Sequence, residues 1–262
     1  MGTDHLTPYD RSLRYLNRKV ARADREFGLL HEGDHVLVAV SGGKDSLVML
    51  EVLARRLAWH HVQYRLTACH VESGHCPPGC SYAAILGKQC AGLGVPLRVV
   101  QAEPLDPSCL AGDGPSPCFL CSWRRRKALF LTAQEAGCNL VALGHHKDDL
   151  AQTLLLNLLW QGRHETMPVR RAMFGGRLTI IRPLALADES QVARVCRLGG
   201  LAVHSCICPH AATSKRETAA ELIRSARRAG CRHAVDNLVA SALRSRQPDD
   251  ADAKSLPGLG ST

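Results

Sequence analysis

Hydrophobic residues near the start of the chain recur with the spacing of an α-helix. These positions are Leu13, Leu16, Val20, Ala23 and Phe27. A basic series has nearly the same spacing and begins two residues earlier: Arg11, Arg14, Arg18, Arg22 and Arg25. Two residues correspond to about 200° around a helix, so the pattern predicts an apolar face and an opposite arginine face. The arginine face is either a solvated surface or a stripe that follows phosphate groups.

Beyond residue 34, short β-branched runs alternate with stretches of helical periodicity. Strands are predicted at 35–40, 64–71, 96–102, 139–144 and 178–183. Helices are predicted between most of them, at 45–58, 81–93, 122–136 and 148–160. This alternation is typical of an α/β fold with a doubly wound parallel sheet. Such a fold binds its ligand at the carboxyl ends of the strands.

The chain divides into four predicted parts. They are a basic helix at 1–30, an α/β domain at 31–186, a helical basic region at 187–246, and a tail at 247–262. The third part includes a short predicted strand at 201–206, and the polar tail is expected to be disordered. A loop at 103–117, rich in Pro, Gly, Ser and Asp, is long enough for a lid or a site-bearing excursion.

Charge and cysteine content narrow the possible functions. The formal net charge of +9 favours a polyanionic partner, with nucleic acid as the first candidate. No apolar run approaches the ~18 residues of a membrane span, and residues 1–15 lack the apolar centre of a signal peptide. We therefore expect no membrane partner and a cytoplasmic location. In a reducing cytosol, clusters among the 12 cysteines indicate a metal or sulfur chemistry rather than disulfides.

A loop between a predicted buried strand and a helix has the composition of a phosphate-binding site. It comprises Ser41, Gly42, Gly43, Lys44, Asp45 and Ser46. Glycines let the backbone approach an oxyanion, a helix N-terminus offers unpaired N–H groups, and Lys44 adds a compact positive charge. The spacing matches neither the Walker A motif nor G-x-G-x-x-G. The alternative is an ordinary strand–helix turn with an incidental lysine.

A second loop of this kind follows the predicted strand at 139–144. Its residues are Gly144, His145, His146, Lys147, Asp148 and Asp149. Acidic residues at a helix N-terminus can serve simply as caps. Beside the first loop, however, Asp148 or Asp149 could position Mg²⁺ or a nucleotide, with His145 and His146 lining the same cleft. His70, near the end of the strand at 64–71, is a further candidate for nucleotide binding.

Two cysteine groups are candidates for a metal or iron–sulfur centre. Cys118 and Cys121 begin a predicted helix, where the N-terminus and the basic residues at 124–127 favour thiolates. Cys206 and Cys208 form the second group. The CxxC and one later cysteine give three thiolates, which suits a [4Fe–4S] cluster with one iron open for a sulfide. Zinc bound by all four cysteines is the alternative.

The other cysteines are interpreted differently. Cys76 and Cys80, near His70 and His75, have an irregular spacing with prolines and are left outside the site. Five more lie in apolar or helical surroundings and are predicted to be small core residues. They are Cys69, Cys90, Cys138, Cys196 and Cys231.

The string SGGKDS after an apolar strand resembles the PP-loop of the N-type ATP pyrophosphatases, which cleave ATP between its α- and β-phosphates. That resemblance implies that residues 41–46 surround the pyrophosphate and that Asp45 helps to hold Mg²⁺. PCFLC, GHHKDD, RPL and a Cys-Pro segment follow in one order. With them the chain resembles the TtcA family, the tRNA 2-thiocytidine synthetases, over roughly residues 10–230.

This second resemblance implies an adenine nucleotide alpha hydrolase-like fold and ATP-dependent thiolation of cytidine 32 in tRNA. It also implies Mg²⁺, a [4Fe–4S] cluster, a sulfide or sulfur-donor protein as partner, and a homodimer. Carried over, the cluster ligands become Cys118, Cys121 and Cys208, with Cys206 in place of Cys208 if the last segment is matched differently. The candidate catalytic residues are then Lys44, Asp45, Cys118, Cys121 and Cys208.

We expect the tRNA backbone to contact the arginine face of the first helix, residues 124–127 and a C-terminal basic group. The last group comprises Lys215, Arg216, Arg224, Arg227 and Arg228. Two other functions fit part of the pattern. One is a PP-loop enzyme in which an amine attacks the adenylate, which needs no cluster. The other is a zinc-stabilised nucleic-acid-binding protein that releases no pyrophosphate.

Overall fold

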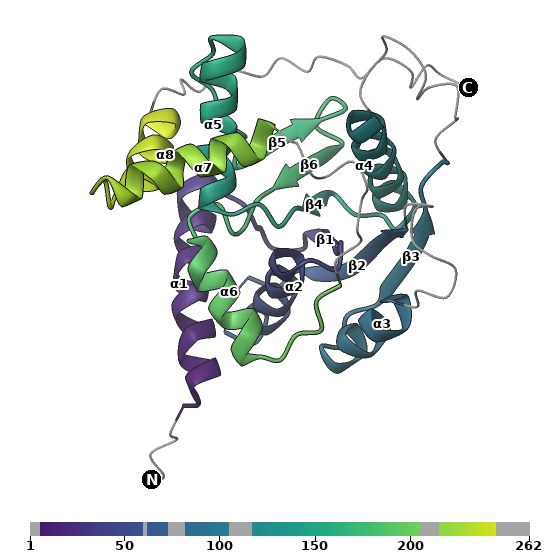
Figure 1. The fold of residues 1–262 in the computed structure, drawn as a ribbon. Helices are drawn as coiled ribbons and strands as arrows, with labels where there is room; N and C mark the ends of the chain where they lie inside the picture. Colours follow the sequence, from purple (N-terminus) through teal and green to yellow (C-terminus); the bar gives the residue numbers. More distant parts are fainter. Residues whose placement is uncertain (1–5, 60–61, 73–81, 105–116, 205–214, 245–262) are drawn as a thin grey trace.

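The computed structural model describes residues 6–59, 62–72, 82–104, 117–204 and 215–244 (Figure 1). Its strands are β1 His35–Ala39, β2 Arg65–Glu72, β3 Leu97–Gln101, β4 Leu140–Ala142, β5 Arg170–Met173 and β6 Leu178–Ile181. Its helices are α1 Pro8–Phe27, α2 Lys44–Arg56, α3 Tyr82–Gly92, α4 Pro117–Glu135, α5 Lys147–Gln161, α6 Glu189–Leu198, α7 Lys215–Arg228 and α8 Ala234–Arg244. None of the helices described is long and apolar enough to span a membrane.

One sheet, in the order β3-β2-β1-β4-β6-β5, organises the molecule. The first five strands of this order are parallel, and β5 pairs antiparallel with β6. The chain moves from β1 outward to β2 and β3, then returns to place β4 on the other side of β1. The loops after β1 and β4 therefore leave the sheet side by side, at the switch point where α/β folds bind ligands.

The buried side chains of β1 alternate between the two faces of the sheet. Val36 and Val38 belong to the larger hydrophobic cluster, which includes residues of α1, α2, α3 and α6. Leu37 points to the other face, where it joins Leu129 and Ala133 of α4. Helices thus cover both faces, and the predicted doubly wound α/β fold is confirmed.

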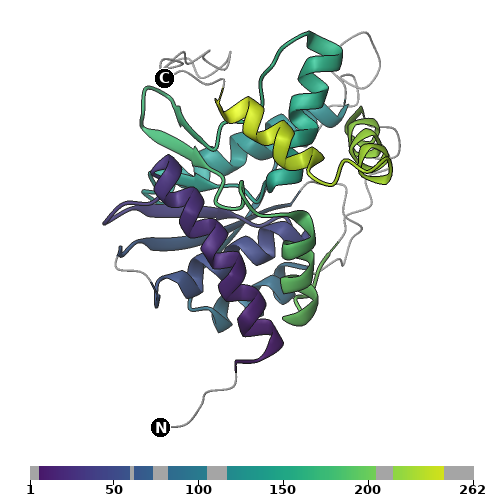
Figure 2. The ribbon, with the colours of Figure 1, turned by 90° about the vertical axis from the view of Figure 1, so that its left-hand side faces the viewer.

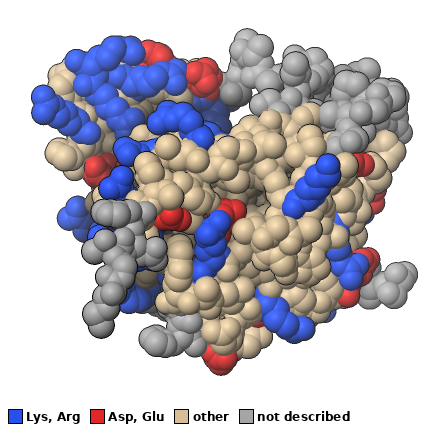
Figure 3. Space-filling view, turned by 90° about the horizontal axis from the view of Figure 1, so that it is seen from below, with Lys and Arg blue, Asp and Glu red and all other residues tan. Residues whose placement is uncertain are grey.

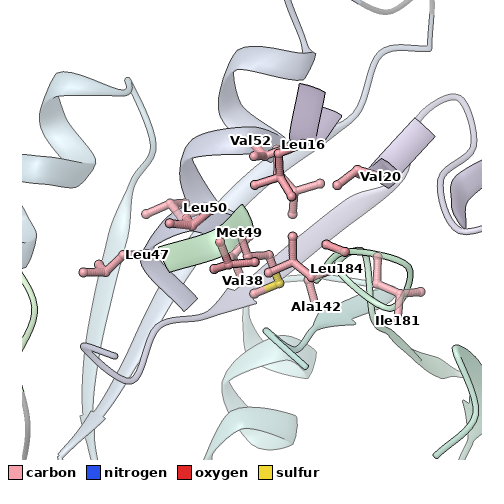
Figure 4. Packing of buried hydrophobic residues seen from close by; sticks show 14 of the residues in the cluster. Leu16, Val20, Val38, Leu47, Met49, Leu50, Val52, Ala142, Ile181 and Leu184 are labelled. Carbon is pink, nitrogen blue, oxygen red and sulfur yellow. The ribbon is translucent and has the colours of Figure 1, made fainter. Parts of the chain in front are cut away.

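The larger cluster joins the first helix to the sheet. Figure 4 shows Leu16 and Val20 of α1 above Met49 of α2, with Val38 and Ile181 of the strands below. The predicted apolar face of this helix is confirmed, because Leu13, Leu16, Val20 and Ala23 are buried. All five arginines of the opposite face are exposed. Figure 2 shows α1 running along the outside of the molecule beside α6.

A buried ion pair also joins α1 to α2. The Arg56 guanidinium donates to Asp24 Oδ2 at 2.6 Å, and Asp24 Oδ1 accepts the Leu30 N–H at 2.9 Å. Both side chains are at least nine-tenths buried. Removal of either partner would leave a buried charge uncompensated, so this pair fixes the helices relative to each other.

Two strand predictions differ from the structure. The prediction missed β5, because Arg-Arg-Ala-Met has neither the alternation nor the β-branched residues of a strand, and its exposed edge position needs neither. The strand predicted at 201–206 is wrong over residues 201–204, which form no ladder. Their backbone contacts the loop after β1 instead. Residues 205–206 and the tail at 247–262 lie outside the described residues.

Candidate active site

The loop after β1 is closed by its own hydroxyl groups. Ser46 Oγ accepts the Ser41 N–H at 3.1 Å and donates to the Gly43 carbonyl at 2.9 Å. Gly42 has a φ of +92°, a left-handed conformation that glycine adopts without a steric cost. These contacts bend the chain sharply between β1 and α2.

The N-terminus of α2 is open for a ligand. Its N-cap, Gly43, has no side chain to accept hydrogen bonds from the first turn. The N–H groups at the start of a helix have no partner within the helix, and with the helix dipole they favour an anion. The loop thus has the backbone geometry of a phosphate site.

The loop after β4 packs directly against the loop after β1. A Cβ added at Gly144 would lie 3.0 Å from the Ser46 nitrogen and 3.1 Å from the Asp45 carbonyl carbon. Both atoms belong to the backbone, which cannot rotate away as a side chain could. Gly144 is therefore required for the close approach of the two loops. The sequence analysis predicted that the loops are neighbours but not that their backbones are in contact.

Asp45 has the features of a cation ligand. Its side chain faces the large cavity, yet Oδ1 is buried and has no hydrogen-bond partner within the described residues. Lys44 Nζ lies 3.4 Å from this oxygen and His146 Nε2 lies 3.9 Å away. Burial raises the pKa of Asp45, although His146 and Lys44 act to lower it, and Asp149 raises it further. A hard divalent cation would relieve both the missing contact and the repulsion.

Lys44 is held on the other side of the loop. Its ammonium lies 3.0 Å from Glu189 Oε1, at the start of α6. Burial alone lowers the pKa of Lys44, but the hydrogen bond to Glu189 and the carboxylate of Asp45 raise it overall. Lys44 lines a cavity of about 640 Å³ beside α6 rather than the large one. For Lys44 to contact a phosphate as predicted, its ammonium must leave Glu189 and turn towards the ligand.

Asp148 and Asp149 point to different places. Asp148 is buried and accepts two hydrogen bonds, from the Glu189 N–H at 3.0 Å and from the Arg227 guanidinium at 3.2 Å. It thereby joins α5 to α6 and α7. Asp149 lines the large cavity. Buried His146 lies between the carboxylates, with Nε2 3.3 Å from Asp149 Oδ2. Of the two predicted alternatives, Asp149 is the one placed to act with Asp45.

His145 lines the cavity as a neutral imidazole. Arg182 Nε donates to its Nδ1 at 3.3 Å, which makes Nδ1 an acceptor and leaves the proton on Nε2. Burial lowers the pKa of His145 to about 4, and the positive charge of Arg182 contributes. At neutral pH the side chain can therefore donate one hydrogen bond to a ligand. His146 does not line the cleft as predicted, because it is covered by the carboxylates.

A group of three aromatic rings covers the first loop, and the sequence analysis had named only His70 among them. His70 donates from Nδ1 to the Val40 carbonyl at 2.7 Å and meets the Tyr82 ring edge-on at 5.6 Å. The His204 ring stacks on Tyr82 at 4.9 Å, and the His204 N–H donates to the Gly42 carbonyl at 3.0 Å. Tyr82 Oη donates to the Ala202 carbonyl at 3.2 Å. Residues 202–204, just before Cys206, are thereby attached to the loop.

The two loops, β2, α4 and the β5–β6 hairpin all contribute residues to one cavity of about 2220 Å³. The loops contribute Ser41, Gly43, Asp45, Ser46, Gly144, His145 and Asp149, and β2 contributes His70. Helix α4 lines it with residues that include Trp123 and Arg125, and the β5–β6 hairpin lines another side. The space is large enough for a nucleotide together with part of a second, larger substrate.

The candidate cluster ligands are described only in part. Cys118 and Cys121 lie one turn apart in α4, and Cys121 is half-buried. The side chain of Cys118 and the whole of Cys206 and Cys208 lie outside the described residues, as do Cys76 and Cys80. Among the residues that are described, no three His, Cys, Asp or Glu side chains converge to hold a metal ion.

Four of the five cysteines predicted to be core residues are buried. These are Cys69, Cys90, Cys138 and Cys196. Burial raises the pKa of the first three thiols to about 11, so they are unreactive at neutral pH. The prediction is wrong for Cys231, which is exposed because it lies in the turn after α7 rather than on a packed face.

Positive charge is spread unevenly over the surface. On the face shown in Figure 3, Lys and Arg crowd at the upper left and stand singly elsewhere. Helix α7 carries much of the predicted basic group, but its arginines are paired. Arg224 binds Glu217 and Glu221, Arg228 binds Glu221, and Arg216 binds Asp149, at 2.6 to 3.1 Å.

Comparison with known proteins identifies the family of the chain. Residues 13–205 match the model of the PP-loop domain. The tRNA-cytidine(32) 2-sulfurtransferase of Anaeromyxobacter dehalogenans (strain 2CP-C) is 40% identical over 181 residues, which are 69% of this chain and 61% of that protein. The chain thus spans about three fifths of the length of that relative. The tRNA-cytidine(32) 2-sulfurtransferase of Nitrosospira multiformis is 33% identical over 210 residues, which are 79% of this chain and 70% of that protein.

A solved structure shares the fold. The U34-tRNA thiolase NcsA from Methanococcus maripaludis, determined with its [4Fe-4S] cluster, superposes with a TM-score of 0.71 at 23% identity. The match covers 89% of this chain and 79% of that one. Together with the two adjoining loops at the switch point of the sheet, these matches show that the chain belongs to the PP-loop family and, within it, to the family of the tRNA-cytidine(32) 2-sulfurtransferases.

Proposed function

We propose that this protein is an ATP-dependent tRNA sulfurtransferase that converts cytidine 32 to 2-thiocytidine. One observation carries the proposal: a phosphate loop with an open helix N-terminus adjoins a second loop, and the two place Asp45 and Asp149 on one cavity. The curated relatives carry the name of this activity. The proposal includes ATP and Mg²⁺ as cofactors and tRNA as partner, and it places the reaction in the cytoplasm.

The first step is adenylation of the base. The oxygen on C2 of the cytosine attacks the α-phosphorus of ATP, the bond to the β-phosphate oxygen breaks, and pyrophosphate leaves. Residues 41–46 would hold the departing pyrophosphate through backbone N–H groups. Asp45 and Asp149 would hold Mg²⁺ against the phosphate oxygens, because carboxylates are its preferred protein ligands. Lys44 would add positive charge after it leaves Glu189.

In the second step a sulfide attacks the same carbon and AMP leaves with the oxygen. A [4Fe–4S] cluster on Cys118, Cys121 and Cys208, or Cys206 instead of Cys208, would supply the sulfide when bound. His204, the last described residue before these cysteines, donates its N–H to the Gly42 carbonyl of the first loop at 3.0 Å. The sulfur comes from free sulfide or a donor protein, and we propose a homodimer on the family resemblance.

Two measurements test this function. In the first, tRNA nucleosides from cells with the gene and from cells without it are compared by mass spectrometry. The cells without the gene should lack 2-thiocytidine. The protein, purified without oxygen, should release pyrophosphate from ATP only when tRNA is present. Unchanged 2-thiocytidine would contradict the assignment of the base. A protein that releases no pyrophosphate with any tRNA would contradict the enzyme class.

A further inference from the structure

The β5–β6 hairpin lines the cavity with arginines, whereas the two loops line it with the carboxylates of Asp45 and Asp149. Its exposed residues Arg170, Arg171 and Arg177 line the cavity, and Arg163 in the segment before β5 lines it as well. Four arginines along one edge therefore face the space where a large substrate would lie. The sequence prediction did not include any of them.

These arginines are free to bind an anion. None of Arg163, Arg170 and Arg171 has a carboxylate within ion-pair distance among the described residues, and Arg177 donates only to the Phe174 carbonyl, at 3.2 Å. On α7, by contrast, Arg224 and Arg228 are each held at 2.6 Å by a glutamate. A paired guanidinium must lose its carboxylate before it binds a phosphate, and an unpaired one need not.

The hairpin is also fixed in place at both ends. At its root, the Arg182 N–H donates to the Val169 carbonyl at 2.9 Å, and the Arg182 side chain reaches His145 in the second loop. At its tip, the Phe174 ring packs edge-on against Phe130 of α4 at 5.6 Å. Phe174 has a φ of +53°, which a bulky residue adopts only when its surroundings impose it. The arginines thus extend on a rigid arm from the candidate active site.

We propose that the phosphate backbone of the tRNA substrate binds to Arg170, Arg171 and Arg177 of this hairpin and to Arg163 in the segment before it. The inference rests on the proposed function. Guanidinium groups bind phosphate through paired N–H donors, and the arm leads from the outer tip to His145 beside the nucleotide loop. A backbone seated on the arm would place a neighbouring base in the cavity.

The test measures binding of unmodified tRNA to the full chain as a function of salt, without ATP. In R170Q/R171Q, affinity falls, and the slope of log K against log salt becomes shallower by about 1.4 to 1.8, because each lost phosphate contact contributes about 0.7 to 0.9. In R170K/R171K, which keeps both charges, the slope returns to that of the wild type. Thermal unfolding confirms that each variant is folded.

The matched control is R65Q/R98Q, which removes the same charge from exposed arginines of β2 and β3. Neither residue lines the cavity or has a carboxylate within ion-pair distance among the described residues, so the salt slope stays within error of the wild type. Equal losses from the two double variants would overturn the proposal, since only net charge would then matter. An unchanged slope in R170Q/R171Q would also overturn it and would leave the arginines as protection of an edge strand. A wild-type protein that does not bind tRNA would instead contradict the proposed function itself.

Discussion

The two walls of the cavity are built in opposite ways. The loop wall, formed by Ser41, Asp45, Gly144, His145 and Asp149, is packed backbone against backbone and exposes carboxylates to the cavity. The arginine wall, formed by Arg163, Arg170, Arg171 and Arg177, is an edge hairpin and the segment before it, with long, exposed cationic side chains. A rigid wall with carboxylates suits a cation and a nucleotide, whereas an open basic wall suits a long polyanion.

Helix α7 shows why basic composition alone does not reveal the second kind of surface. It is as rich in arginine as the hairpin, but Arg216 and Arg227 are bound to Asp149 and Asp148 of the second loop. Its charges therefore stabilise the loop wall rather than form a free surface. A basic surface that is free to bind a polyanion therefore differs from α7 in the partners of its side chains, not in its arginine content.

The largest effect should come from Asp45→Asn, which removes the carboxylate from the loop wall without changing its shape. Pyrophosphate release should fall by about 100-fold or more, because a cation that neutralises developing phosphate charge contributes several kcal/mol. Binding of tRNA without ATP should be unchanged or slightly tighter, because one negative charge is lost. A loss of tRNA binding equal to that of R170Q/R171Q would show that the walls do not act separately.

Gly144→Ala should disturb the loop wall by packing alone. The new Cβ would lie 3.0 Å from the Ser46 nitrogen, so the two loops must move apart, at a cost of about 1–3 kcal/mol. Calorimetry should detect weaker ATP binding, and urea unfolding should detect the lower stability. The control is Gly87→Ala in α3, which meets no atom within 4 Å and has no positive φ. Alanine there should stabilise the helix slightly.

His145 lies where the walls meet, and its titration should be visible in stability. Its pKa falls from 6.5 to about 4 on folding, chiefly through burial. Between these values the unfolded chain binds more protons than the folded one, so this stabilisation is complete above pH 6.5 and is lost as the pH falls towards 4. From pH 7 to pH 5, the wild type should lose about 2 kcal/mol more than His145→Asn in urea unfolding. Equal losses would contradict a buried neutral imidazole.

Features of the fold and of the candidate site that depend on a local residue pattern could be predicted from the sequence. The strand–loop–helix at Val36–Leu47 and the second loop at Gly144–Asp149 have the turn residues, apolar runs and spacing that define a switch-point site. The apolar and arginine faces of α1 followed from periodicity alone. These features depend on residues that are close in the chain.

Features that depend on distant residues could not be read in this way. Asp148 and Asp149 look equivalent in sequence, but the Glu189 N–H of α6 and Arg227 of α7 bind Asp148 away from the cavity. Asp149 lines the cavity, where Arg216 of α7 binds it. Arg170 and Arg224 likewise look equivalent in sequence. Among the described residues, however, Arg224 has two glutamate partners and Arg170 has no carboxylate partner. Tyr82 and His204 are 122 positions apart (204 − 82), and nothing near either residue indicates that their rings stack.

The smallest effect should follow Tyr82→Phe, which tests whether the loop wall includes the segment at 202–204. The change removes only the hydrogen bond from Tyr82 Oη to the Ala202 carbonyl, worth about 1 kcal/mol, and keeps the stacked ring. The His204 N–H, bound to the Gly42 carbonyl, should then exchange with deuterium about fivefold faster when opening of the segment is local. The matched control is Tyr64→Phe, which removes a 2.8 Å hydrogen bond to the Leu53 carbonyl in the core. If Tyr64→Phe accelerates exchange at His204 as strongly, the effect is global destabilisation, and Tyr82 does not hold the segment on the loop.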